Sequence, residues 1–298
     1  CNIPAGICEN GYIHPGGFFM GRITHMAMCT NNNRRLARFY KIVFGWDEVW
    51  NPFQNSPHAF YIGDGYFNLN CLQIRPGAAK KREAGVVNSR GAGVVVDGKV
   101  ILPEVGMNHI GFQVDDLAEA NRRLASLTPK ITPVASPPDG RYEDQRFIDP
   151  AGNDIELSQR VWDPGPKMTP AMARHVAYNA EDPDRSAEFF KFVVDMKQVG
   201  RKESKATGMT AVYLSDGTMN LALVKNSPIA KKSVQLLGIK VPSIKEVGER
   251  LRQSSEFLYP GEPEVELRER PADSPFRTVY LRDPDGNEID LSEEGWEL

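Results

Sequence analysis

The sequence predicts an α+β fold, because one unit of a strand, a helix and further strands occurs four times along the 298 residues. The clearest copy spans residues 107–158. Its first strand, 107–114, alternates with a period of two, and its helix, 115–127, has small and large apolar residues at spacings of three and four. Its last strand, 153–158, follows an Asp-Pro-Ala-Gly turn.

The other three copies have the same order of elements. Their predicted elements are the strands 23–28, 58–62, 67–74, 174–178, 211–214, 219–224 and 234–239, the helices 34–44, 184–194 and 243–251, and the strand-bearing segment 282–292. Copies one and three share the pattern of 61–69 and 213–221, and copies two and four share an ending, Asp-Pro-x-Gly-Asn-x-Ile-(Glu/Asp)-Leu-Ser. The chain is therefore a duplicated pair of units.

The duplication predicts two domains. We place their boundary in the segment 162–166, which contains two prolines and one glycine. The predicted domains are 21–162 and 167–298. Residues 1–20 are rich in glycine and lack an apolar signal core, so we expect an irregular N-terminal arm there.

Composition limits the class of partner. A net charge of -3 and a pI near 6.0 give no basic surface for nucleic acid, and no apolar run is long enough to span a membrane, so a small-molecule partner is expected. The four cysteines lie in the first quarter of the chain without a CxxC pair. This distribution argues against a disulfide framework or a thiolate zinc site and favours a cytoplasmic location.

The copy at 107–158 has a candidate metal ligand at each end. Alternation places His109 on one face of its first strand, and Asp154 and Glu156 share a face of its last strand. A lone histidine or glutamate on a strand is more often packed or solvated than a ligand. A histidine on the first strand together with a carboxylate on the last strand, however, is a combination of side chains that can bind a divalent ion.

The repeat and its Asp-Pro-x-Gly-Asn ending resemble the vicinal oxygen chelate superfamily, which includes glyoxalase I, extradiol dioxygenases and bleomycin resistance proteins. The resemblance implies βαβββ units paired into two tandem cupped, barrel-like domains, and a homodimer as a common assembly. It also implies metal ligands at His25, His109 and Glu156 in the first cup. In the second cup the matching residues are His175, Leu236 and Asp290, so we expect a structural or lapsed site there.

Two imidazoles and one carboxylate are typical of non-haem Fe(II) enzymes, so Fe(II) is the expected metal, with Mn, Zn or Ni as alternatives. The expected function is a metal-dependent enzyme on an oxygen-chelating organic substrate, most concretely an extradiol-type ring-cleaving dioxygenase. A glyoxalase-like lyase, isomerase or epimerase and a non-catalytic binding protein are the alternatives. The strand at 67–74 offers Asn68 and Asn70, or Leu69 and Cys71, and no carboxylate base, which disfavours proton transfer of the glyoxalase kind.

Other residues are candidates for supporting roles. His58 is expected to act as an acid or base near the metal, and Tyr142 to donate a hydrogen bond to the substrate, with Tyr61 as a further candidate. The long insertion at 77–99 is expected to form a lid or a surface excursion. The aromatic Trp296, near the end of the chain, is expected to dock on the second cup or to contribute to an interface.

Overall fold

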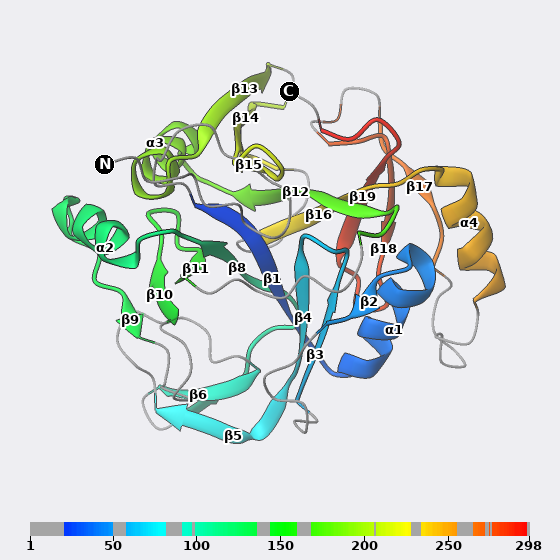
Figure 1. The fold of residues 1–298 in the computed structure, drawn as a ribbon, viewed down its shortest axis with the longest axis horizontal. Coiled ribbons are helices and arrows are strands. Elements are labelled where there is room, and N and C mark those ends of the chain that lie inside the picture. Colours follow the sequence, from blue (N-terminus) through cyan, green and yellow to red (C-terminus); the bar gives the residue numbers. More distant parts are fainter. Residues whose placement is uncertain are drawn as a thin grey trace, which may run out of the picture.

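Two eight-stranded sheets and one three-stranded sheet, with four helices, make up the described part of the protein (Figure 1). The computed structural model describes residues 21–49, 58–81, 91–96, 99–135, 144–159, 168–205, 207–227, 234–254, 265–271, 274 and 276–296. The predicted arm at 1–20 and the predicted domain boundary at 162–166 lie outside the described residues.

The first sheet has the strand order β2-β3-β4-β1-β8-β11-β10-β9. Its elements, with the helices of the same domain, are β1 (Arg22–Thr30), α1 (Asn33–Phe44), β2 (Asp47–Glu48), β3 (Ala59–Gly63), β4 (Asn68–Gln73), β8 (Gly106–Gln113), α2 (Leu117–Ser126), β9 (Val134–Ala135), β10 (Asp144–Ile148) and β11 (Asp154–Ser158). β1 pairs with β8 in antiparallel fashion, and each pairs with the last strand of its own unit in parallel fashion. The first two repeats therefore join along β1 and β8.

The second sheet repeats this arrangement in the order β13-β14-β15-β12-β16-β19-β18-β17. Its domain contains β12 (Met172–Asn179), α3 (Pro183–Val194), β13 (Lys197–Ser204), β14 (Met209–Ser215), β15 (Asn220–Lys225), β16 (Val234–Lys240), α4 (Ile244–Gln253), β17 (Arg268–Glu269), β18 (Val279–Arg282) and β19 (Glu288–Ser292). β12 and β16 join its two repeats as β1 and β8 do in the first sheet. The predicted α+β fold of two tandem domains is confirmed.

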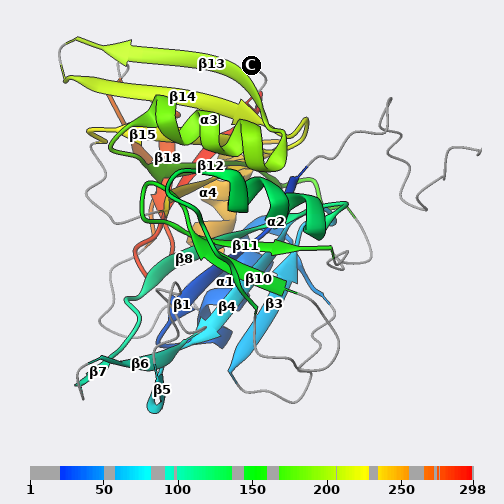
Figure 2. The ribbon, with the colours of Figure 1, turned by 90° about the vertical axis from the view of Figure 1, so that its left-hand side faces the viewer.

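The third sheet overlaps the insertion predicted at 77–99 and extends two residues beyond it at each end. It consists of β5 (Arg75–Lys81), β6 (Ala92–Val96) and β7 (Lys99–Ile101), with β5 parallel and β7 antiparallel to β6. Figure 2 shows this sheet extending away from the two larger sheets. The described part of the insertion is thus an ordered excursion from the first domain.

Each helix begins where a side chain caps its first turn. Asn32, Asp116, Asp182 and Ser243 accept hydrogen bonds from backbone N–H groups three residues later, at 2.9–3.2 Å. The helices begin and end within two residues of the positions that the apolar spacing predicts. Within the described residues, none of these helices has the length and apolarity that a membrane span requires.

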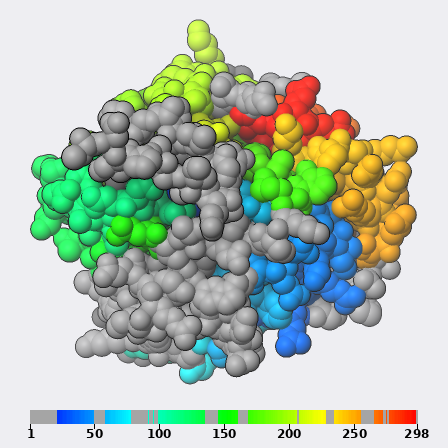
Figure 3. All heavy atoms as spheres, viewed as in Figure 1, coloured from blue at the N-terminus to red at the C-terminus, as the bar shows by residue number. Residues whose placement is uncertain are grey.

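One apolar core joins the two domains. A single cluster of buried side chains contains residues of both large sheets and of all four helices. Within it the ring of Phe112 in β8 stacks on Phe190 in α3, with centroids 5.7 Å apart. On another side α1 lies against α4 (Figure 3). There the Arg250 guanidinium donates to the carbonyl of Val43 (3.2 Å). Each sheet therefore turns one face to this shared core and keeps the other for its own cup, where smaller apolar clusters lie.

Two buried aspartates in equivalent turns each accept a hydrogen bond from the other domain. Asp64, after β3, accepts a hydrogen bond from the backbone N–H of Ala173 in the second domain (2.7 Å). Asp216, after β14, accepts one from Ile23 in the first domain (2.7 Å). Each carboxylate also accepts two N–H groups of its own turn. Burial raises the pKa of both carboxyl groups, and these backbone donors oppose that shift.

We predict that Asp216→Ala lowers the free energy of unfolding by about 3 kcal/mol, because two buried N–H groups and one part-buried N–H group lose their acceptor and each unsatisfied buried donor costs about 1–3 kcal/mol. Urea unfolding followed by circular dichroism measures the change. Glu181→Ala removes an exposed carboxylate just before α3 and serves as the control. Equal stability of the two variants would contradict the role assigned to Asp216.

Candidate metal centre

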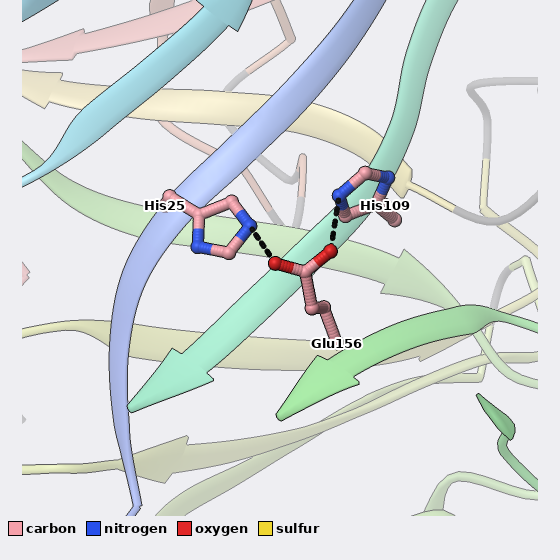
Figure 4. Close-up of side chains that lie close together, drawn as sticks. All are labelled: His25, His109 and Glu156. Atoms are coloured by element: carbon pink, nitrogen blue, oxygen red, sulfur yellow. Dashed lines mark ion pairs between the residues drawn. The ribbon is translucent and has the colours of Figure 1, made fainter. Parts of the chain in front are cut away.

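Three side chains from three adjacent strands meet on the concave face of the first sheet. His25 lies in β1, His109 in β8 and Glu156 in β11 (Figure 4). His25 and Glu156 both pair with Gly111 of β8, and His109 precedes that glycine by two residues on the same face. The register of the sheet therefore brings together residues that are 131 positions apart in the sequence.

The three side chains have donor atoms close enough for one ion. His25 Nε2 lies 3.4 Å from Glu156 Oε1, and His109 Nε2 lies 3.6 Å from Glu156 Oε2. One ligand atom from each residue lies within 4.8 Å of the others. Ligands bound to a single ion at about 2.0–2.2 Å lie about 3–3.5 Å from one another, so little movement is needed. All three side chains are at most 2% exposed, which excludes bulk water from the donor atoms.

Gly111 makes room for the imidazole of His25. A Cβ built at this glycine would overlap the ring, and its nearest atoms would be those of His25. No larger residue can occupy the position while His25 keeps its place beside Glu156. Position 111 is therefore a glycine for a steric reason. Its neighbours Ile110 and Phe112 point to the opposite face of the sheet, into the shared core.

The far side of the His109 ring has polar partners that the sequence did not reveal. Its Nδ1 lies 2.8 Å from Asn108 Oδ1 and 3.1 Å from Arg146 Nη2. Arg146 in turn donates to Asp154 through Nη2 and Nε (2.6 and 3.1 Å). The two neighbours of Nδ1 require different tautomers, because Asn108 Oδ1 accepts from a protonated Nδ1 whereas Arg146 Nη2 can only donate to an unprotonated one. The tautomer with Nδ1–H donating to Asn108 leaves the Nε2 lone pair on the side of Glu156, and it is the form that can ligate a metal through Nε2.

The residues of β4 complete this face of the cup. Asn68 pairs with His25 and Asn70 with Ala27, so the two amides share the face of the cluster, whereas Leu69 and Cys71 lie in the shared core. Of the two registers that the sequence allowed, the structure has the first. The concave face of β4 therefore carries amide groups where a proton-abstracting carboxylate would otherwise be placed.

The structure does not bring His58 to the cluster. His58 is exposed just before β3, and its carbonyl accepts a hydrogen bond from the N–H of Gln73 (2.8 Å). Asn68, the strand partner of His25, lies five residues before Gln73 in β4. At roughly 3.3 Å per residue, the strand positions next to His58 and His25 are therefore about 16 Å apart. The expected role of His58 beside a metal is therefore not supported. Tyr142 lies outside the described residues.

The second cup has the same register but different contents. His175 and Asp290 both pair with Gly238, and Leu236 stands opposite Ala177, as His109 stands opposite Ala27. The indole of Trp296 stacks on the His175 ring, with centroids 5.3 Å apart and planes 3° from parallel. Among the described residues, the first-cup cluster is the one group of His, Cys, Asp or Glu spaced for a metal.

In the second cup the guanidinium of Arg270 pairs with the carboxylates, in place of a metal cation. Arg270 pairs with both Asp290 and Glu288 and lies over the ring of Tyr280, 4.0 Å from its centroid. Burial raises the pKa of Asp290 to about 6, although Arg270 acts in the opposite direction. Burial lowers the pKa of His175 to about 3, and Arg277 acts in the same direction, so this imidazole is neutral at physiological pH.

We predict that Gly111→Ala lowers the free energy of unfolding by about 2 kcal/mol, because the new methyl group overlaps the His25 ring. Chemical unfolding of the full chain measures this cost. In a double-mutant cycle, His25→Ala removes the overlap, so the second substitution should recover about 1 kcal/mol or more of that loss. Gly77→Ala, at an open position, is the control and should change stability little. Additive effects at Gly111 and His25 would contradict the steric account.

Comparisons with known proteins agree with the fold and the duplication. A model of the Glyoxalase/Bleomycin resistance protein/Dioxygenase superfamily matches residues 22–157 and 173–291. No curated protein sequence matches the chain.

Similar solved structures include the 2,3-dioxygenase LapB from Pseudomonas sp. KL28, with a TM-score of 0.60 and 17% identity over 91% of each chain. Homoprotocatechuate 2,3-dioxygenase from Arthrobacter globiformis has a TM-score of 0.60 and 12% identity over 91% of this chain and 79% of its own. The Mn(II)-bound glyoxalase from Novosphingobium aromaticivorans has a TM-score of 0.60 and 14% identity over 92% of this chain and 83% of its own. At these identities the likeness concerns the fold alone. Because the family model covers both domains, the chain belongs to the Glyoxalase/Bleomycin resistance protein/Dioxygenase superfamily, the vicinal oxygen chelate group.

Proposed function

We propose that the first cup binds one divalent metal ion through His25, His109 and Glu156, and that the protein is a metal-dependent enzyme acting on a small organic molecule with two adjacent oxygens. The convergence of two imidazoles and one carboxylate, buried and within 4.8 Å of one another, supports this proposal most directly. Three protein ligands on one side of an ion leave its other positions for substrate.

The most specific form of the proposal is Fe(II)-dependent extradiol-type ring cleavage of a catechol-like substrate. The ion would supply Lewis acidity toward both substrate oxygens and redox chemistry with dioxygen. The two-histidine, one-carboxylate donor set is the one that non-haem Fe(II) oxygenases use. Two of the similar structures named above are 2,3-dioxygenases, which is consistent with this choice. Mn, Zn and Ni are the alternative metals.

The residues of the cup have defined tasks in this proposal. Asn108 holds the Nδ1 proton of His109 and thereby orients its ring. Asp154 anchors the Arg146 guanidinium beside the cluster, 3.1 Å from His109 Nδ1. Tyr61 and Asn70, paired on β3 and β4 and facing the cup, offer a hydroxyl and an amide for hydrogen bonds to a bound substrate.

A glyoxalase-like lyase, isomerase or epimerase is the second candidate, since a Mn(II)-bound glyoxalase shares the fold. Such a reaction needs a base that abstracts a proton from carbon. The amides of Asn68 and Asn70 cannot act as that base. The concave face of β4 therefore favours the oxygenase, and the two candidates differ in whether dioxygen is consumed.

Oxygen consumption tests the proposal. The protein is loaded anaerobically with Fe(II), mixed with catechol and its 3- and 4-substituted derivatives, and followed with an oxygen electrode and by the absorbance of the ring-opened product. We predict turnover of at least one catechol, reduced about a hundredfold or more in His109→Ala because the ion loses a ligand. His58→Ala removes an exposed imidazole and should retain the wild-type rate.

Circular dichroism shows whether both variants are folded. Iron that is bound by wild type and lost in His109→Ala, with no oxygen consumed on any catechol, would contradict the dioxygenase form and favour the lyase or isomerase. Equal turnover in His109→Ala and His58→Ala would contradict the assigned metal ligands. A protein that binds no divalent metal after reconstitution would leave a non-catalytic binding protein.

A further inference from the structure

The second domain contains a cavity of about 530 Å³ at one end of its cup. The cavity is bounded by the start of β12 and β13, the turn between β14 and β15, the end of β16 and the segment that carries Trp296. Its wall next to the cup is fixed, because Asn220 donates a hydrogen bond to the carbonyl of Trp296 and the indole stacks on His175. All residues that line the cavity belong to the second domain, so the cavity is separate from the first-cup cluster.

The charged side chains that line the cavity are mostly cationic. Arg174, Lys197 and Lys240 line it together with one carboxylate, Glu294. Among the described residues, neither lysine has a carboxylate within 4.0 Å. Arg174 donates to the carbonyl of Ala173 (2.6 Å) and makes no ion pair in the same part of the chain. Two lysines without a carboxylate partner and one arginine therefore face one space. The charge of Arg174 also acts on the buried carboxyl of Asp64 in the first domain, and its guanidinium lies 5.8 Å from the centroid of the Tyr66 ring.

Three other arginines of this domain have carboxylate partners. Arg201 pairs with Asp184 and Glu203, and Arg282 pairs with Glu288 (2.8 Å). Arg270, described above, has two carboxylate partners. Cations that gather around a cavity without such partners raise the local concentration of anions, because clefts lined by one sign of charge focus the field.

The positive charge is specific to the second domain and is not a property of the fold. The equivalent positions in the first domain follow from the register. Thr24 precedes His25 as Arg174 precedes His175, and Asp47 stands opposite Gly63 as Lys197 stands opposite Ser215. In the first sheet Gln113 lies two residues after Gly111, the partner of His25. In the second sheet Lys240 lies two residues after Gly238, the partner of His175. Where the second domain has three cations, the first has a hydroxyl, a carboxylate and an amide.

We propose that this cavity binds a small organic anion that carries a carboxylate or phosphate group. The lysines and Arg174 supply the charge, and the side chains of Ser215, Thr218 and Asn220 in the lining supply neutral hydrogen-bonding groups. A volume of about 530 Å³ lies within the range of small-molecule sites. The second domain, whose cup is filled by Trp296 and Arg270, then has a ligand of its own.

Isothermal titration calorimetry of the full chain with inorganic phosphate and, separately, with succinate tests the proposal and distinguishes the two chemical sources. Both titrations are run at constant ionic strength, so that general screening does not change. We expect one saturable site per chain for at least one of the two anions. The double variant Lys197→Gln/Lys240→Gln should weaken that binding about tenfold or more, because two of three cations are lost.

Lys225→Gln/Lys245→Gln is the matched control, because it removes the same net charge from two exposed lysines of the same domain outside the cavity. It should leave the affinity unchanged. Equal weakening by both double variants would show a general charge effect and overturn the proposal. Binding that survives in Lys197→Gln/Lys240→Gln and is lost in His109→Ala would place the anion at the first cup, which also overturns it. Absence of saturable binding of either anion up to about 10 mM has the same consequence.

Discussion

The pairing of His25 and Glu156 with the same residue, Gly111, is the constraint on which the candidate site depends. It places a histidine and a carboxylate on either side of one glycine, and the overlap of any Cβ with the His25 ring keeps that position small. The strands that carry these residues also pack their other faces into the core shared by both domains. A shift of one residue in register would turn the ligands into the apolar core and the core residues into the cup, so packing and site enforce each other.

The two domains solve the same electrostatic problem differently. Each has a buried carboxylate at the equivalent position of its last strand, and a buried carboxylate requires a positive or hydrogen-bonding partner. In the first domain Glu156 lies between two imidazoles, an arrangement that a divalent ion can complete. In the second domain Arg270 neutralises Asp290, and Trp296 fills the space over His175. Duplication has therefore kept the backbone while the chemistry of the cups has diverged.

Much of this fold could be predicted from sequence, because the repeat fixes it. The four helices follow from apolar spacing, and the three candidate ligands follow from the resemblance to the vicinal oxygen chelate superfamily, with alternation giving the face of each strand on which they lie. The edge strand β13 was not predicted, since its exposed, charged residues lack an apolar alternation. The roles of Arg146 and Arg270 depend on contacts across strands, which one sequence does not reveal. Asn108 is the sequence neighbour of His109, and its contact depends on a side-chain orientation that alternation along the strand does not predict. The sequence does not give the pairing of β4 with its neighbours, so it could not show that His58 and His25 lie beside opposite ends of that strand.

The number of metal ions bound per chain tests the central claim most directly. The protein is purified anaerobically, and its metal content is determined by mass spectrometry against protein concentration. If the first cup holds an ion and the second is neutralised by Arg270, one equivalent of a divalent metal per chain is expected, with iron as the metal if the dioxygenase form is correct. Two equivalents per chain, or none after reconstitution, would contradict the account.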